Sequence, residues 1–245
     1  MTHSGQKNSE FPGQNSGPAT PAIPATPAIP ATSAIPTTVS VSPSRPILVA
    51  MTGASGSAYG LGLVQALLAA QQRVDLLLSD AALQVLAQEC DLKWPADTTA
   101  RQHVLADYFG AGLDRLRHYG LTDWYAPAAS GSGGGGRMVI CPCSMGTLGA
   151  LAHGISDNLI RRAADVVLKE GGQLLLVPRE TPLTIIHLEN MVRLARIGAI
   201  ILPASPGFYH RPATVNDLVD FIVERILTRL GIPGRPSPLW PPAAG

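Results

Sequence analysis

Short apolar runs alternate with longer amphipathic segments through the middle of the chain. The apolar runs predict buried strands at 47–51, 74–78, 138–141, 174–177 and 199–202. Apolar residues at helical spacing predict helices at 59–70, 81–89, 145–153, 158–170, 184–196 and 215–230. Residues 95–120 are mixed and include one or two helices, whereas 126–137 have the composition of a mobile loop. Five strands that alternate with helices predict a single α/β domain of the Rossmann-like or flavodoxin-like kind, a mainly parallel sheet between two helical layers.

Proline separates this domain from both ends of the chain. Of the 22 prolines, many fall before residue 46, where PAIPAT recurs, and others cluster after residue 232. Such segments have little to bury and favour an extended, solvated chain. We therefore expect a disordered tail at 1–44, a folded domain at 45–232 and a second tail at 233–245. A proline-rich docking ligand is the alternative interpretation of the first tail.

The composition excludes some partners. Charged residues make up only 14% of the chain and the net charge is +1, so nothing favours nucleic acid or an anionic membrane. We expect no membrane-spanning segment, because no apolar run is long enough, and no signal peptide, because the first residues are polar. The three cysteines, an odd number, fit a reduced, cytoplasmic setting.

Small residues follow the first predicted strand. In a doubly wound sheet the ligand lies at the carboxyl ends of the strands, so the segment at 52–60, TGASGSAYG, is a candidate site for an anion or nucleotide. A plain tight turn is the alternative. A short-chain dehydrogenase is disfavoured, because no tyrosine has a lysine four residues later.

A second motif, CPCSMGTL at 141–148, follows the third predicted strand. We interpret it as a turn whose hydroxyls and amides contact a ligand. A zinc site is disfavoured because Cys-x-Cys lacks a second ligand pair, and a nucleophilic Cys143 lacks a recognisable base.

Cationic residues mark three further segments. Arg162 and Lys169 are seven residues apart and so share one face of a predicted helix, although a solvated surface stripe is the plainer explanation. Arg179 directly follows the fourth predicted strand, and Tyr209 follows the fifth, with Arg225 on the next helix. Arginine with lysine, serine and tyrosine suits a phosphate, and no acidic cluster suggests a divalent metal.

The five motifs GASGxxYG, CPCSxGTL, DNLIxRAADVxLKE, PRExPLxxIHLENM and PGFYHRP, in this order, resemble the flavin prenyltransferase family of the UbiX type. The resemblance runs from about 45 to 232, essentially the whole folded region. It implies an enzyme that joins a dimethylallyl group from dimethylallyl monophosphate to N5 and C6 of reduced FMN without a metal. It also implies that a UbiD-type decarboxylase receives the prenylated FMN, and that the enzyme is a homo-oligomer, a dodecamer built from trimers.

The resemblance also assigns roles to residues. Ser55, Glu89, Lys169 and Glu180 are the implied catalytic residues, the two glutamates handling protons. The implied FMN contacts are Gly53, Ala54, Ser55, Ser79, Ser144, Met145, Gly146, Thr147 and Arg179. The implied contacts of the prenyl phosphate are Lys169, Tyr209, Arg225 and, from a neighbouring subunit, Arg162. Trp124 and Tyr209 are expected to flank the allylic chain, and we expect His187 and His210 to be structural hydrogen-bonding residues.

Two alternatives stay open beside this interpretation. A flavin-dependent cysteine decarboxylase of the related fold needs a histidine near the end of the first helical region, where this sequence has LGLVQALL. A non-catalytic flavin carrier is disfavoured because Ser55, Lys169, Glu180, Tyr209 and Arg225 are all retained.

Overall fold

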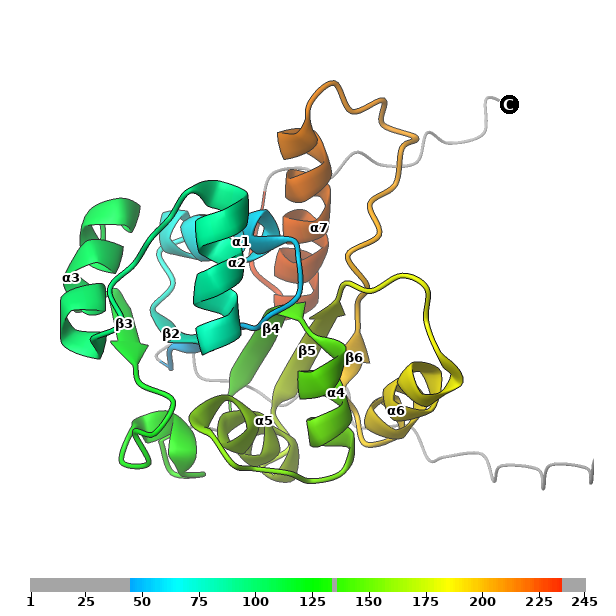
Figure 1. Ribbon diagram of the computed structural model, residues 1–245, viewed down its shortest axis with the longest axis horizontal. Coiled ribbons are helices and arrows are strands. Elements are labelled where there is room, and N and C mark those ends of the chain that lie inside the picture. The colour runs from blue at the N-terminus through cyan, green and yellow to red at the C-terminus, as the bar shows by residue number, and fades with distance from the viewer. Residues whose placement is uncertain (1–44, 134–135, 235–245) are drawn as a thin grey trace, which may run out of the picture. The chain divides into compact units, whose positions relative to one another are not determined.

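A six-stranded parallel sheet forms the centre of the domain (Figure 1). The computed structural model describes residues 45–133 and 136–234. The strands are β1 (Ile47–Met51), β2 (Val74–Leu78), β3 (Leu116–Tyr119), β4 (Arg137–Cys143), β5 (Gln173–Pro178) and β6 (Ile200–Ile201). Their order across the sheet is β3-β2-β1-β4-β5-β6, and every pairing is parallel. This is the doubly wound order of the Rossmann fold, which confirms the predicted fold class.

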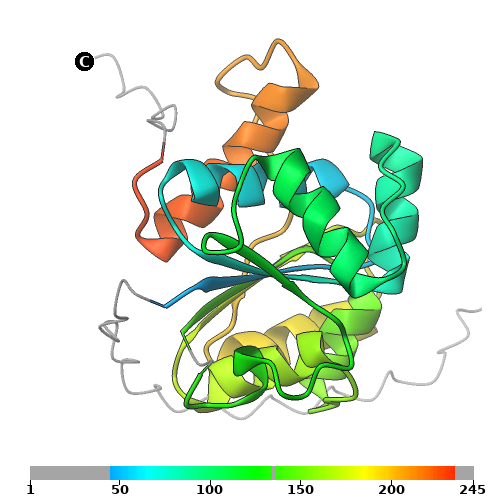
Figure 2. The same cartoon turned by 90° about the vertical axis from the view of Figure 1, so that its left-hand side faces the viewer.

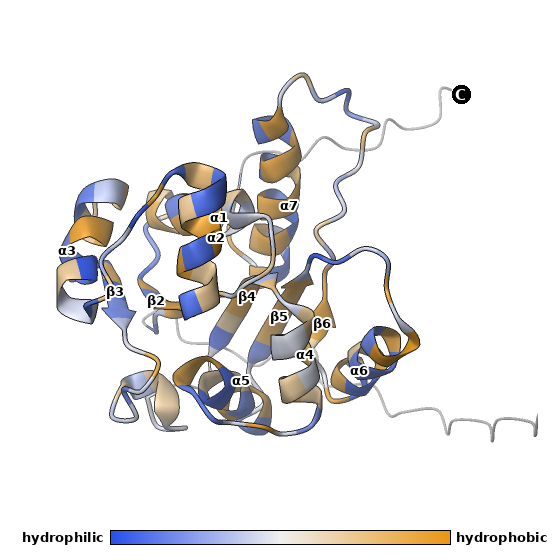
Figure 3. Cartoon of the chain, viewed as in Figure 1, coloured by the Kyte–Doolittle hydropathy of each residue, from blue (hydrophilic) through white to orange (hydrophobic). Residues whose placement is uncertain are grey.

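Helices cover both faces of the sheet (Figure 2). One apolar cluster joins the sheet to α1 (Ser57–Ala69), α2 (Asp80–Cys90), α3 (Thr98–Phe109) and α7 (Val215–Leu230). A second cluster joins the other face to α4 (Met145–Ala152), α5 (Leu159–Lys169), α6 (Ile185–Arg196) and the short 3₁₀ helix η1 (Pro127–Ala129). The hydropathy colouring shows mostly apolar residues in the inner strands β4 and β5, between helices that carry both apolar and polar residues (Figure 3).

The sequences of the central strands are continuous apolar runs because helices cover both faces of these strands. All five residues of β1 are buried, and Leu174, Leu175, Leu176 and Val177 of β5 are fully inaccessible. Four of the short apolar runs therefore correspond to the inner strands β1, β2, β4 and β5, and the fifth, at 199–202, corresponds to the edge strand β6.

Two features of the sheet differ from the prediction. The mixed region 95–120 contains α3 and also a sixth strand, β3, which sequence patterning missed. β3 is an outer strand whose residues alternate between buried and exposed, so its LRHY sequence lacks an apolar run.

The other difference concerns β4, which extends to Cys143. The segment Cys141–Cys143 therefore belongs to a strand and is not the predicted turn. Its pairing with β5 shifts register between Ile140 and Cys143, which accommodates Pro142 and its missing N–H.

The two predicted tails lie outside the described residues, apart from Pro233 and Gly234. Within the described part of the chain, no helix has the length and apolar character needed to cross a membrane.

Candidate active site

A crevice opens at the carboxyl edge of the sheet, where the strand order reverses between β1 and β4. This reversal is the point at which doubly wound sheets bind their ligands. The crevice has a volume of about 290 Å³, and its lining residues are mostly small and polar: Thr52, Gly53, Ser79, Ala81, Ser144, Gly146, Thr147, Asn158, Ile160 and Arg161. The first two strand-end motifs of the sequence therefore converge on one cavity.

Thr52 links the two central strands at the floor of this crevice. Its side chain, only 3% exposed, donates a hydrogen bond to the carbonyl oxygen of Pro142 (3.0 Å) and accepts one from the N–H of Ser144 (2.8 Å). Sequence analysis included Thr52 as the first residue of the candidate segment 52–60 but gave it no individual role.

Glycine is required twice in the turn that follows. A Cβ on Gly53 would lie 2.5 Å from the Cβ of Ala81, so no larger residue fits between β1 and α2. Gly56 has φ 108° and directly precedes α1, a conformation that glycine adopts without strain. These two glycines let the backbone approach a ligand closely.

Glu89 holds the start of α1 from the neighbouring helix α2. Its carboxylate accepts hydrogen bonds from the N–H of Gly56 (3.0 Å) and of Ser57 (2.8 Å). Partial burial raises the pKa of Glu89, but hydrogen bonds from Ser55, Ser57 and Gly56 outweigh it and hold the pKa below its ordinary value. Glu89 is therefore an ionised acceptor at neutral pH.

Three helices begin at the crevice, each with a side-chain cap. Ser79 accepts from the N–H of Ala82, Ser144 from that of Thr147, and Asn158 from that of Arg161. Because helix N-termini present free N–H groups and a positive dipole end, they favour an anion such as a phosphate. Asn158 and Arg161 had no role in the sequence analysis, although asparagine before an apolar helical run is a recognisable cap.

Arg179 and Glu180 follow β5 at the same edge of the sheet. The Arg179 Nε donates to the carbonyl oxygen of Ser55 (3.2 Å), which brings this guanidinium against the turn after β1. Glu180 is exposed and accepts a hydrogen bond from the N–H of Thr181 (3.1 Å). Arg179 therefore joins the segment after β5 to the turn after β1, whereas the hydrogen bond of Glu180 stays within its own segment.

Tyr209 and Arg225 form a separate pair on the α7 side of the sheet. The Arg225 Nη2 donates to the Tyr209 hydroxyl (3.2 Å), and the guanidinium lies over the Phe221 ring, 5.2 Å from its centre. The tyrosine ring also packs edge-on against Phe221. This arrangement fixes a phenol and a cation side by side.

Arg162 and Lys169 lie on the other face of the sheet, on α5. Arg162 donates to the carbonyl oxygen of Ala129 (3.0 Å) and pairs with Asp165 (3.1 Å), whereas Lys169 pairs with Glu170. Lys169 ends α5 just before β5 begins, so it lies at the amino edge of the sheet, while Glu180 follows the other end of β5. Six residues of strand separate these ends by about 17 Å. One chain therefore does not bring Lys169 to Glu180, Tyr209 or Arg225.

Trp124 also lies on the α5 side. It follows β3 in the loop leading to η1, which packs on α5, and its side chain is 46% exposed. Tyr209 packs against α7 on the opposite face, so the two aromatic residues expected to flank one ligand belong to different faces of a single chain.

The remaining candidates have structural surroundings. Cys141 and Cys143 are fully buried; burial raises the pKa of Cys143 to about 12 and raises that of Cys141 further, so neither thiol is a ready nucleophile. His187 completes the cap of α6, as expected. His210 instead stacks on Phe221, and its ring nitrogens have no hydrogen-bond partner within the described residues. Among those residues, no group of three or more potential ligands is placed to hold a metal ion.

Comparison with known proteins agrees with this geometry. A family model described as Flavoprotein matches residues 37–227. A flavin prenyltransferase UbiX of Pseudomonas aeruginosa is 55% identical over 194 residues, which are 79% of this chain and 93% of the relative. A solved structure of AnUbiX (PadA1) with FMN and dimethylallyl pyrophosphate is 37% identical and has a TM-score of 0.67. The match covers 77% of this chain and 93% of that chain. A solved structure of a dodecameric FMN-dependent UbiX-like decarboxylase of Escherichia coli O157:H7 is 38% identical and also has a TM-score of 0.67. That match covers 79% of this chain and 97% of that chain.

Proposed function

The chain belongs to the flavoprotein family and, within it, to the UbiX-type flavin prenyltransferases, and we propose that it joins a dimethylallyl group from dimethylallyl monophosphate to N5 and C6 of reduced FMN. A UbiD-type decarboxylase would then receive the prenylated product. The observation that carries the proposal is the crevice at the strand-order reversal, whose small, polar lining and three capped helix N-termini suit a flavin nucleotide.

FMN binding would use groups that one chain supplies. Gly53, Ala54 and Ser55 lie in the turn where the backbone can approach the flavin, and Arg179 donates to that same turn. Ser79 would bind from the start of α2, and Ser144, Met145, Gly146 and Thr147 from the start of α4. The fit rests on the number of hydrogen-bond donors in the crevice, which suits an anionic, oxygen-rich nucleotide.

The prenyl phosphate would be bound between two chains. Tyr209 and Arg225 form one half of this site, whereas Arg162, Lys169 and Trp124 lie on the opposite face of their own chain. We therefore extend to Lys169 and Trp124 the expectation made for Arg162, that a neighbouring subunit provides them. This requires an oligomer, in keeping with the dodecameric relative.

An exposed apolar face on and beside α6 supports such an assembly. Five aliphatic side chains there are between 43% and 67% exposed: Leu183, Ile185, Ile186, Leu188 and Val192. Because a monomer rarely leaves so many neighbouring aliphatic side chains in water, we expect this face to be covered by another copy.

Cations and aromatic rings would together promote breaking of the allylic carbon–oxygen bond. Lys169, Arg162 and Arg225 would stabilise the charge that grows on the departing phosphate, a contact stronger in the transition state than in the ground state. The rings of Trp124 and Tyr209 would stabilise positive charge on the allyl group and exclude water. Glu89, already ionised, and Glu180 would handle the protons. One proton would leave N5 and one would leave C6 as the new bonds form, while one would be delivered to the middle carbon of the allyl group and one to the released phosphate.

Mass spectrometry of the flavin tests the proposal. After anaerobic incubation of the enzyme with reduced FMN and dimethylallyl monophosphate, we expect the flavin to gain one prenyl unit, in chelator-treated enzyme as well. An unchanged FMN mass with release of CO₂ from a carboxylic acid would favour the decarboxylase alternative, and an unchanged mass without CO₂ would favour a flavin carrier.

A further inference from the structure

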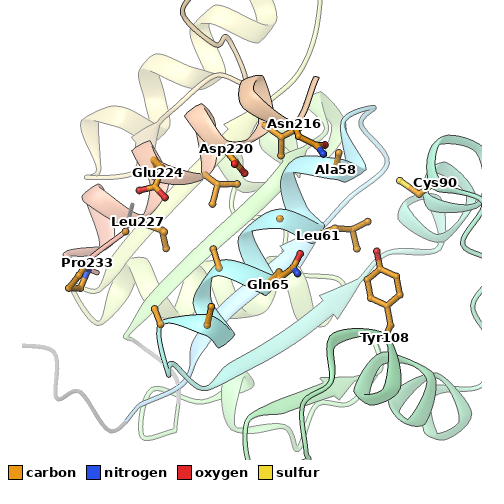
Figure 4. A pocket seen from close by; sticks show the side chains of 17 residues that line it. Ala58, Leu61, Gln65, Cys90, Tyr108, Asn216, Asp220, Glu224, Leu227 and Pro233 are labelled. Carbon is orange, nitrogen blue, oxygen red and sulfur yellow. The ribbon is translucent and has the colours of Figure 1, made fainter. Parts of the chain in front are cut away.

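A groove runs along the outer surface of α1, away from the crevice (Figure 4). It has a volume of about 740 Å³ and lies between α7 on one side and Cys90 and Tyr108 of α2 and α3 on the other. Its lining shares only Ala58 of α1 with the neighbourhood of the glycine-rich turn and none of the residues assigned to FMN or the prenyl phosphate. The proposed function leaves this groove unexplained.

The groove combines an apolar floor with an acidic rim. Leu61, Val219, Val223 and Leu227 are buried beneath it, and alanines and Gly62 of α1 leave room above them. Asp220 and Glu224 lie along the α7 rim, one helical turn apart. A ligand that fits would be apolar and slender and would carry a positive charge near the rim.

The chain itself enters this groove. Pro233 and Gly234, the last described residues, line it next to Leu227, and Gly234 lies so close to the Glu224 carboxylate that a Cβ there would collide with it. The next residue in the sequence is Arg235, so a cation directly follows the point where the backbone meets an acidic side chain.

We propose that residues 235–245 of the same chain occupy the groove. Their sequence, RPSPLWPPAAG, joins a cation to an apolar Leu239–Trp240 pair between prolines. Prolines favour the extended polyproline conformation, which loses little entropy when it docks beside aromatic side chains. Here Tyr108, 47% exposed, offers an aromatic ring on the far wall.

The segment is long enough to run the length of the groove. Along α7 the lining extends from Leu227 back to Asn216, eleven residues of rise or about 17 Å. Eleven residues in the polyproline conformation span about 34 Å. The segment is also tethered at the groove, which gives it an effective concentration in the millimolar range. The match to the flavoprotein family model ends at residue 227, before this segment.

The thiol of Cys90 reports on occupancy, because it lines the groove whereas Cys141 and Cys143 are fully buried. We would measure its rate of reaction with a maleimide in the full-length, FMN-loaded protein. For an intrinsic affinity of about 0.1 mM, tethering predicts about tenfold protection. A chain ending at Gly234 and the variant W240A should therefore react about tenfold faster, and a synthetic peptide of residues 235–245 should slow the truncated protein again.

Matched changes make the test specific. S237A, in the same segment, should leave the rate of Cys90 labelling unchanged, and R235E should raise it. Equal labelling rates in the wild type, W240A and the truncated chain would overturn the proposal. So would a rate that rises only when residues 1–42 are removed, or only when the protein is diluted, since the occupant would then be the other tail or a second copy.

Discussion

The crevice at the carboxyl edge and the cationic face of α5 are built in opposite ways. The crevice is assembled within one chain, where Thr52, Ser144 and Arg179 connect the turns after β1, β4 and β5 by hydrogen bonds. The cationic face carries Arg162 and Lys169 along one helix, and its distal end lies at the amino edge of the sheet. The fold of one chain completes the crevice, whereas we propose that the cationic face acts on the substrate of a neighbouring chain.

Helix direction explains the difference. In a parallel sheet every crossover helix runs back from the carboxyl edge to the amino edge, so only its first turn reaches the crevice. Arg161, in the first turn of α5, lines the crevice, whereas Lys169, in the last turn, does not. Two residues on one helix can therefore serve two different sites, which are brought together only when chains assemble.

The strongest test of this comparison is complementation between two inactive variants. We expect K169A and E180A each to retain FMN and to prenylate it about a hundredfold more slowly. In co-expressed mixed oligomers some sites combine an intact Lys169 with an intact Glu180, so part of the rate should return. Prenylated FMN is measured by mass spectrometry.

K93A, which changes an exposed lysine outside both regions, should behave as the wild type. The double variant K169A/E180A mixed with itself should stay slow. If K169A and E180A oligomers gain nothing on mixing, Lys169 does not act across an interface.

Removing the Thr52 hydroxyl at the floor of the crevice should weaken flavin binding. T52V keeps the shape but removes the donor to the Pro142 carbonyl and the acceptor for the Ser144 N–H. The Pro142 carbonyl keeps its hydrogen bond from the Thr52 backbone N–H (3.1 Å), but the Ser144 N–H loses its acceptor. Leaving such a group unpaired costs about 1–3 kcal/mol, so the thermal midpoint and the FMN affinity should both fall. Calorimetry and flavin fluorescence titration measure these quantities, and T52S should restore both. A T52V protein with normal FMN affinity would mean that this link does not shape the site.

The pH dependence of stability reports on Glu89. Because its pKa in the folded protein is below the ordinary value, its stabilising contribution is present above that value and is lost as the pH falls through the folded pKa. Thermal melts of the wild type should therefore show a decline at acidic pH that is smaller in E89Q. A decline of equal size in E89Q would assign it to other carboxylates.

The smallest effect is expected outside both regions. Removal of residues 1–42 should leave the prenylation rate unchanged, because the proposed machinery begins at Gly53. The truncated and full-length proteins are compared at equal FMN loading. A slower truncated enzyme would show that the first tail contributes to one of the two regions.

Sequence patterning was sufficient where local physics decides the structure. Apolar runs such as 174–177 predict strands covered on both faces, and Asn158 and Ser144 are caps recognisable from the helices they precede. The resemblance added the order of the motifs and the family, which the comparisons confirm. Strand β3 was not predicted because buried and more exposed positions alternate along it, so its sequence has no apolar run.

Only the tertiary structure decided which motifs meet. By itself the sequence determined an α/β domain with small and polar residues after its strands, and it set Arg162 and Lys169 on one helix face. It did not determine that Thr52 ties β1 to β4, because a hydrogen bond across 90 residues depends on strand order. Nor did it separate Lys169 from Glu180, which are eleven residues apart in sequence but at opposite edges of the sheet, because the length of β5 lies between them.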